Sequence, residues 1–180
     1  MKPCLHSIFD IEMIVIRAGQ SADLNRVTAI AKSCAQHMIN QGIFQWNEHY
    51  PSKKVFEKDL NRSELFVIEK ENHVIGAIVI STLMDEEYKE VKWLTPNENN
   101  RYIHRLCVDP TYQKNGFAKS LLDFAENKCK DQNVTSIRLD TFSQNPRNLK
   151  FYRNRDYIQL EEIYFHRQSE FPFYCFELVL

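Results

Sequence analysis

Residues 101–130 place a strand, a loop and a helix in direct succession, and this stretch limits the possible folds more than any other. Residues 101–108 alternate and then become continuously apolar, which predicts a strand with a buried end. From residue 117 to about residue 129, apolar side chains recur at three- and four-residue steps, which predicts an amphipathic helix. The dipeptide Asp109-Pro110 separates the two elements.

The connecting loop has the sequence Gln113-Lys114-Asn115-Gly116-Phe117-Ala118. A glycine-bearing loop that leads directly into a helix gathers free N–H groups and the positive end of the helix dipole at one point. Gly116 lets the backbone approach an anion closely because it has no Cβ. The loop therefore predicts a phosphate or pyrophosphate site. With four glycines in the chain and no G-x-x-x-x-G-K-[ST], neither a Walker loop nor a G-x-G-x-x-G fingerprint can be assembled.

The rest of the chain alternates helices with strands and shows no repeat or low-complexity linker, which predicts one α/β domain with a mixed sheet. That domain is expected to span residues 13–180 after a possible extension at residues 1–12, and Met13 is a possible internal start. The expected strands are 14–17, 64–69, 73–82, 101–108, 136–141, 157–165 and 173–179, and the expected helices are 22–38 with Ser21 as N-cap, 53–60, 117–129 and 146–154.

Composition excludes several functional classes. A formal net charge of −1 offers no electrostatic footprint for nucleic acid. Five cysteines without C-x-x-C pairs or metal-type spacing predict reduced thiols, no metal and a cytoplasmic protein. No apolar run is long enough for a membrane span, so no membrane partner is expected. The apolar segment 171–176 belongs either to a homodimer interface or to the core.

Two motifs carry a family resemblance. Residues 113–118, after LCVDP, resemble the Q/R-x-x-G-x-G/A loop of the GNAT superfamily of acyl-CoA-dependent N-acetyltransferases. Residues 145–157, NPRNLKFYRNRDY, resemble the family's N-x-x-A-x-x-F-Y-x-x-x-G-F segment, and the two motifs stand in the family's order. The resemblance implies a mostly antiparallel twisted sheet flanked by helices. It also implies transfer of acetyl from acetyl-CoA to a primary amine of a small molecule or peptide, by direct attack in a ternary complex.

The same resemblance implies the coenzyme contacts. Loop amides from Gln113 to Ala118 would hold the pyrophosphate, and the backbone of Leu106, Cys107 and Val108 would bond the pantetheine arm. Asn145 would cap the following helix, hydrogen-bond that arm, or do both. The sequence departs from the pattern at Asp156-Tyr157, where the family has glycine and phenylalanine, and the first loop position lacks the commoner arginine.

The catalytic residues are likewise implied by position. Tyr152 matches the family's general acid, with packing beside Phe151 as the alternative. The strand period puts Tyr102, His104 and Leu106 on one face and Ile103, Arg105 and Cys107 on the other. In arylalkylamine N-acetyltransferases two histidines relay protons at the places of Tyr102 and His104, so His104 is either a base or a partly buried structural histidine.

The acceptor side is less constrained. Trp46, His49 and Tyr50 lie in an aromatic segment that either lines an acceptor pocket or anchors packing. The acidic run 85–90 is either a solvated face or an acidic mouth that attracts a cationic amine. Two other functions compete: a catalytically silent acyl-CoA sensor, and a cysteine hydrolase built on Cys107 or Cys129, for which no partner His/Asn arrangement is visible.

Overall fold

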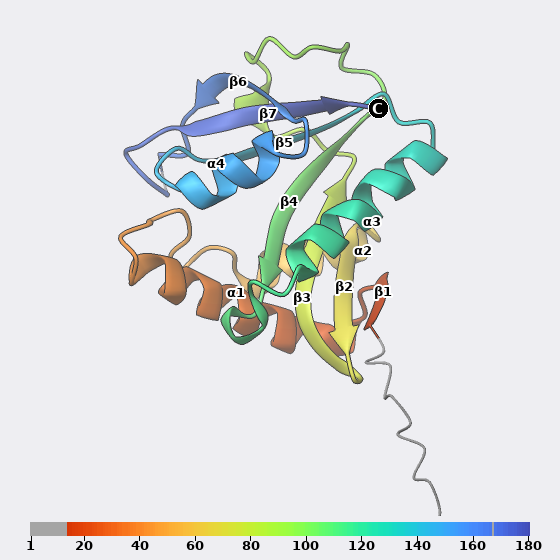
Figure 1. The fold of residues 1–180 in the computed structure, drawn as a ribbon, viewed down its shortest axis with the longest axis vertical. Helices are drawn as coiled ribbons and strands as arrows, with labels where there is room; N and C mark the ends of the chain where they lie inside the picture. The colour runs from red at the N-terminus through yellow and green to blue at the C-terminus, as the bar shows by residue number, and fades with distance from the viewer. Residues whose placement is uncertain (1–13, 167) are drawn as a thin grey trace, which may run out of the picture.

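Residues 14–166 and 168–180 are described in the computed structural model (Figure 1). The possible extension at residues 1–12 and the possible start at Met13 lie outside them. The described residues form one α/β domain, a twisted and mostly antiparallel sheet flanked by helices, as the sequence predicted.

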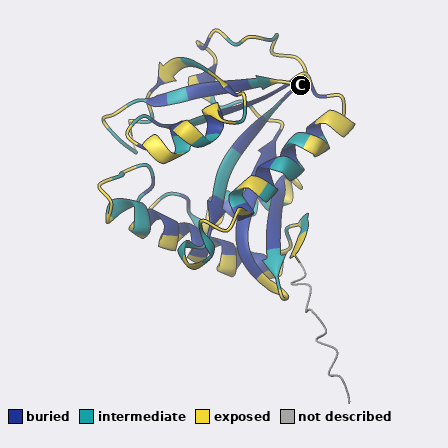
Figure 2. Ribbon diagram, in the orientation of Figure 1, coloured by how far each residue is buried: buried dark blue, intermediate teal, exposed yellow. Residues whose placement is uncertain are grey.

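The sheet has seven strands within the described residues, in the order β1-β2-β3-β4-β5-β7-β6. Neighbouring strands are antiparallel except β4 and β5, which are parallel. The strands are β1 (Ile14–Ala18), β2 (Leu65–Lys70), β3 (His73–Ser81), β4 (Asn100–Val108), β5 (Ser136–Phe142), β6 (Ile158–Ile163) and β7 (Phe173–Val179). The apolar runs predicted the central strands, and Figure 2 shows these strands buried.

Helices cover both faces of the sheet. The helices α1 (Leu24–Ile39) and α2 (Lys53–Asn61) pack on one face, whereas α3 (Phe117–Asp131) and α4 (Pro146–Arg153) pack on the other. Short 3₁₀ turns lie at η1 (Ser21–Asp23), η2 (Glu86–Tyr88) and η3 (Pro110–Tyr112). Within the described chain, no helix combines the length and apolarity that a membrane crossing needs.

The start of α1 differs from the expectation. Ser21 does not cap this helix, which begins three residues later, at Leu24, after the turn η1. The reason is the Asp23 carboxylate, which accepts the backbone N–H of Gln20 at 2.8 Å and a hydrogen bond from Arg17 at 2.7 Å. These contacts satisfy the first turn in a tighter 3₁₀ form.

The strand β4 has two irregular features that shape one end of the sheet. Its ladder with β5 ends at the pair Tyr102–Arg138, and beyond this point the two strands diverge (Figure 1). Its ladder with β3 shifts register at Arg105, which has a φ of 52°. This bulge inserts one extra residue. The predicted grouping of Ile103 with Cys107 is therefore wrong, because these side chains join core clusters on opposite faces.

A buried ion pair holds the end of the sheet where β4 and β5 are still paired. The Arg138 guanidinium donates to Glu177 Oε1 at 3.0 Å, and both side chains are fully buried. The same carboxylate accepts hydrogen bonds from Ser136 at 2.6 Å and Thr95 at 2.5 Å. The guanidinium also stacks over Trp93, with its carbon 4.6 Å from the ring centre. The pair thus ties β5 and β7 to the segment before β4.

We expect the substitution Glu177→Gln to lower the free energy of unfolding by about 3 kcal/mol, because it leaves the buried Arg138 charge without its counterion. Burial alone would raise the Glu177 pKa, but hydrogen bonds from Ser136, Thr95 and Arg138 outweigh burial and lower it. The carboxylate therefore stabilises the fold above the unfolded-state pKa, about 4.3, and loses this contribution as the pH falls further.

Urea unfolding at pH 7 and at about pH 3 measures both effects. The exposed Glu170→Gln is the matched control and should change stability by less than about 0.5 kcal/mol. A Glu177→Gln protein as stable as the wild type at pH 7 would contradict the role of the pair.

Candidate active site

A cleft of about 440 Å³ opens between β4, the start of α3, α4 and the end of α1. It lies where β4 and β5 have diverged, so the strand edge is not covered by a neighbour. The predicted coenzyme residues line this cleft, with the exception of Asn115: they are Leu106, Cys107, Val108, Gln113, Lys114, Gly116, Phe117, Ala118 and Asn145. The side chain of Asn115 instead donates to the carbonyl oxygens of Tyr112 and Gln113, at 3.1 and 3.2 Å.

The loop at the floor of the cleft has the conformation that close anion contact needs. Gly116 has a φ of 84°, in the left-handed region, and a Cβ built there would meet no atom within 4 Å. The backbone at Gly116 therefore faces open space immediately before the first turn of α3, which begins at Phe117. The first N–H groups of a helix have no partner within it, so they are available to an anion.

The charge of this cleft is positive. Lys114, Lys119, Arg147 and Lys150 line it, and no Asp or Glu belongs to the part of its lining that the structure describes. Arg147 on α4 donates to Gln113 Oε1 at 3.0 Å, while Gln113 Nε2 donates to the Val108 carbonyl at 3.0 Å. Arg147 thus brings a guanidinium to the loop position where the family commonly has its own arginine. The lining of the cleft is therefore complementary in charge to an anion.

A second, smaller chamber of about 80 Å³ adjoins the first. The two share the lining residues Gln45, Trp46, Leu106, Asn148 and Tyr152, so the chamber lies directly beside the cationic cleft. The shared Gln45 accepts a hydrogen bond from Asn145 Nδ2 at 2.9 Å. Asn145 also accepts from the backbone N–H of Asn148 at 3.2 Å, which confirms its predicted role as the cap of α4.

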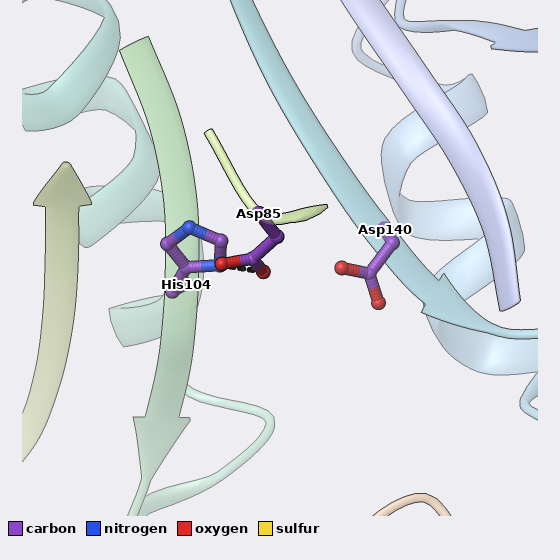
Figure 3. A group of neighbouring side chains, drawn as sticks. All are labelled: Asp85, His104 and Asp140. Carbon is purple, nitrogen blue, oxygen red and sulfur yellow. Dashed lines mark ion pairs between the residues drawn. The ribbon is translucent and has the colours of Figure 1, made fainter. Parts of the chain in front are cut away.

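Three titratable side chains line the chamber and face one another across the gap between β4 and β5. A ring nitrogen of His104 and one carboxylate oxygen from each of Asp85 and Asp140 lie within 4.8 Å of one another (Figure 3). His104 Nδ1 lies 3.8 Å from Asp85 Oδ2. Asp140 Oδ1 accepts a hydrogen bond from the hydroxyl of Tyr88 at 2.6 Å.

Burial changes the proton affinities of this cluster in opposite directions. Burial lowers the pKa of His104 to about 3, and the nearby charges of Arg105 and Arg62 act in the same direction. Burial raises the pKa of Asp140 to about 7. The negative charge of Asp85 also raises this pKa, whereas the hydrogen bond from Tyr88 lowers it. The imidazole is therefore neutral at pH 7, and the Asp140 carboxyl titrates near neutrality.

The bulge residue Arg105 adds no free positive charge to the chamber. Its guanidinium makes two 2.7 Å hydrogen bonds to the Asp59 carboxylate and donates to the Tyr50 hydroxyl at 3.2 Å. Arg62 also donates to Asp59 at 2.7 Å. This arrangement pairs Arg105 with a buried carboxylate of α2 and fixes the β4 bulge.

The structure brings together most of the other predicted site residues. Tyr152 is buried where cleft and chamber meet, and burial, together with the charge of Asp140, raises its pKa. Trp46 and Tyr50 line the chamber. His49 lines neither space: it is exposed, and its ring lies 3.4 Å from the Glu48 carboxylate.

Tyr102 also lines neither space. It is buried, with its ring centre 5.8 Å from that of Tyr88. Sequence reasoning did not single out Asp140 or Gln45 at all. For Asp140 a signal was available, because SIRLDTF puts one carboxylate among the apolar residues of a central strand, where an unpaired charge is costly. Asp85 belongs to the acidic run that the sequence analysis did identify.

Neither Cys107 nor Cys129 lies in a nucleophilic site. Cys107 and Cys129 are buried, and burial raises the pKa of both thiols, that of Cys129 to about 11. A protonated thiol is a poor nucleophile. The geometry therefore gives no support to a cysteine hydrolase.

Comparison with known proteins agrees with this geometry. The model of the acetyltransferase (GNAT) family matches residues 26–157. The chain is 23% identical, over 75% of its length and 76% of the other, to the uncharacterized N-acetyltransferase YesJ of Bacillus subtilis. A GNAT acetyltransferase from Streptococcus agalactiae superposes with a TM-score of 0.78 at 15% identity, over 93% of this chain and 95% of that one.

A further similar structure contains the coenzyme. The PaiA N-acetyltransferase of Thermoplasma acidophilum, in complex with coenzyme A, has a TM-score of 0.69 at 18% identity, over 93% of this chain and 99% of its own. Fold, cleft and family model therefore agree. The chain belongs to the GNAT family of acetyltransferases.

Proposed function

We propose that this protein is an N-acetyltransferase that moves the acetyl group of acetyl-CoA to a primary amine of a small molecule or peptide. The observation that carries the proposal is the pair of adjoining spaces whose lining side chains differ in charge. Lysine and arginine side chains line the large cleft, whereas two aspartates line the small chamber. Such a pair matches a polyanionic donor and a cationic acceptor that meet at one point, and it supports direct attack in a ternary complex.

The donor would lie along the large cleft. The amides from Gln113 to Ala118 would bind the pyrophosphate, and the open edge of β4 from Leu106 to Val108 would bond the pantetheine arm. The carbonyl of Val108 already accepts hydrogen bonds from Gln113 at 3.0 Å and Cys34 at 3.1 Å. A backbone N–H near Val108 would then stabilise the developing oxyanion, a contact that is worth about 3 kcal/mol in related chemistry.

Tyr152 would protonate the leaving sulfur. Its position between the two spaces supports this role, since the thioester has to lie between donor cleft and acceptor chamber. His104 is a weaker candidate for the base than the sequence suggested, because a pKa of about 3 makes it a poor proton acceptor at neutral pH. Tyr102 lies too far into the core to contact the acceptor directly.

The cellular location that we propose is the one expected from the sequence, the cytoplasm. The described cysteines are free and buried, which supports a reducing, cytoplasmic environment. The segment 171–176 contributes Phe173, Cys175 and Phe176 to the core, so its apolar character needs no second copy of the chain. The homodimer stays a prediction, which light scattering can test.

The decisive experiment mixes the purified protein with acetyl-CoA and a panel of primary alkylamines, polyamines, amino acids and short peptides. Release of free thiol reports turnover, and calorimetry with coenzyme A reports binding. We expect both. Coenzyme binding without turnover on any amine would instead support a silent acyl-CoA sensor, and the absence of binding would contradict the proposal.

Replacement of Gly116 by Val should reduce the affinity for coenzyme A at least tenfold in calorimetry. A β-branched side chain in the left-handed region is strained and would project into the space that the anion needs. Gly42→Val is the matched control, because Gly42 also has a positive φ, 74°, and open space around it but lines neither cleft nor chamber. Equal affinity in both variants would contradict anion binding at this loop.

Replacement of Tyr152 by Phe should lower kcat by roughly 100-fold with unchanged affinity for coenzyme A, because it removes only the proton that the thiolate needs. Tyr157→Phe serves as control: Tyr157 is also buried, packs against Tyr152 and donates to Glu126 at 3.3 Å, but lines neither space. Steady-state kinetics and calorimetry measure the two quantities. A fully active Tyr152→Phe enzyme would rule out the acid role.

A further inference from the structure

We propose that Asp140, held in place by Tyr88, is the residue that takes the proton from the acceptor ammonium. This inference rests on the proposed function and names a group that the sequence motifs do not contain. Asp140 lies on β5 two residues beyond the last pair of the β4–β5 ladder, where the strands have diverged and the chamber begins. Its carboxylate therefore faces the space in which an acceptor amine would meet the thioester.

The hydrogen-bond pattern of Asp140 leaves one oxygen available. Among the described residues, the Tyr88 hydroxyl alone hydrogen-bonds its side chain, through Oδ1 at 2.6 Å. Tyr88 is fully buried, and its ring packs against those of Trp93 and Tyr102, with ring centres 5.3 and 5.8 Å away. A rigid donor of this kind fixes the carboxylate, whereas Oδ2 accepts no hydrogen bond from any residue that the structure describes. A carboxylate that is largely desolvated and lacks a counterion favours the approach of a cation.

The surroundings decide which group of the chamber acts as base. His104 is neutral and weakly basic, and Asp85 lies at the mouth with a side chain that is 43% exposed. Asp140 has a pKa of about 7, close to the value at which a general base is most effective. The titratable and charged groups that interact with Asp140 or share its chamber are Tyr50 from the α1–α2 loop, Asp85, Glu87 and Tyr88 from the η2 segment, His104 and Arg105 from β4, Tyr152 from α4 and Cys175 from β7.

The proton and electron balance of the step is complete. The ammonium R–NH₃⁺ gives one proton to the Asp140 carboxylate, and the nitrogen lone pair forms the new C–N bond to the thioester carbon. Collapse of the tetrahedral intermediate breaks the C–S bond. The departing thiolate takes a proton from Tyr152, and the phenolate recovers one from the amide nitrogen. Asp140 then releases its proton to solvent past Asp85.

The two proton transfers are coupled through charge. The negative charge of Asp140 is one of the causes that raise the Tyr152 pKa. Once Asp140 has accepted the ammonium proton, that charge is neutralised, and Tyr152 becomes a better acid just before the sulfur needs its proton. One event thus prepares both the nucleophile and the leaving group.

The pH dependence of kcat/KM tests the assignment in the amine panel assay. The base must be unprotonated, so wild-type kcat/KM should rise with pH through an apparent pKa near 7. Asp140→Asn should lower kcat/KM at pH 7 by roughly 100-fold and abolish this rise, the acidic limb of the pH profile. Tyr88→Phe should move the limb to higher pH, because the hydrogen bond stabilises the carboxylate. The exposed Glu98→Gln, a matched carboxylate-to-amide control that lines neither cleft nor chamber, should keep wild-type values.

A second readout does not depend on turnover. The carboxyl ¹³C resonance of Asp140 in the protein alone, assigned with Asp140→Asn, should titrate near pH 7. A titration near pH 4, or an Asp140→Asn enzyme that keeps the limb, would overturn the inference while leaving the transferase function intact. If Asp140 titrates near pH 7 but the protein binds no coenzyme A, the proposed transferase function is wrong, whereas the raised proton affinity of Asp140 is confirmed.

Discussion

The early divergence of β4 from β5 is the constraint on which the rest of the molecule depends. Two parallel strands that kept their ladder to the end would close the middle of the sheet, and neither the large cleft nor the chamber would exist. The ladder ends at Tyr102, and the next residues of β4 carry a bulge that the Arg105–Asp59 pair holds in place. At the opposite end the buried Arg138–Glu177 pair keeps β5 and β7 together. The sheet is therefore firmly tied at one end and open at the other.

The opening separates charges of opposite sign. Helix α3 begins at the cationic cleft, where its unpaired N–H groups and dipole add to Lys114 and Arg147. The chamber on the other side of Tyr152 contains Asp85 and Asp140, and the only cations close to it are already paired with Asp59 within the described part of the chain. In the proposed function, a polyanionic donor and an ammonium would each be attracted to one of two adjoining spaces, and the reacting atoms would meet where these spaces adjoin.

Burial rather than residue type determines which side chain can act on a proton. Histidine has the ordinary pKa closest to neutrality, yet desolvation and two guanidinium charges make His104 a weak base. Aspartate is ordinarily a far weaker base, yet desolvation and neighbouring carboxylates bring Asp140 to about 7. In the chamber the aspartate is therefore a stronger base than the histidine. The reason is that a medium of low dielectric constant disfavours the charged form, which is the protonated form of histidine and the deprotonated form of aspartate.

Much of the architecture was predictable from the sequence because it depends on local patterns. Apolar alternation and three- and four-residue spacing predicted the strands and the helices, with the Gly116 loop between β4 and α3, and LCVDP…QKNGFA with NPRNLKFY indicated the family. Other features arise only when distant segments meet. The bulge at Arg105 depends on Asp59 across the fold. Asp140 on β5 lies 52 residues after Tyr88, and its proton affinity depends on the desolvation that tertiary packing alone produces.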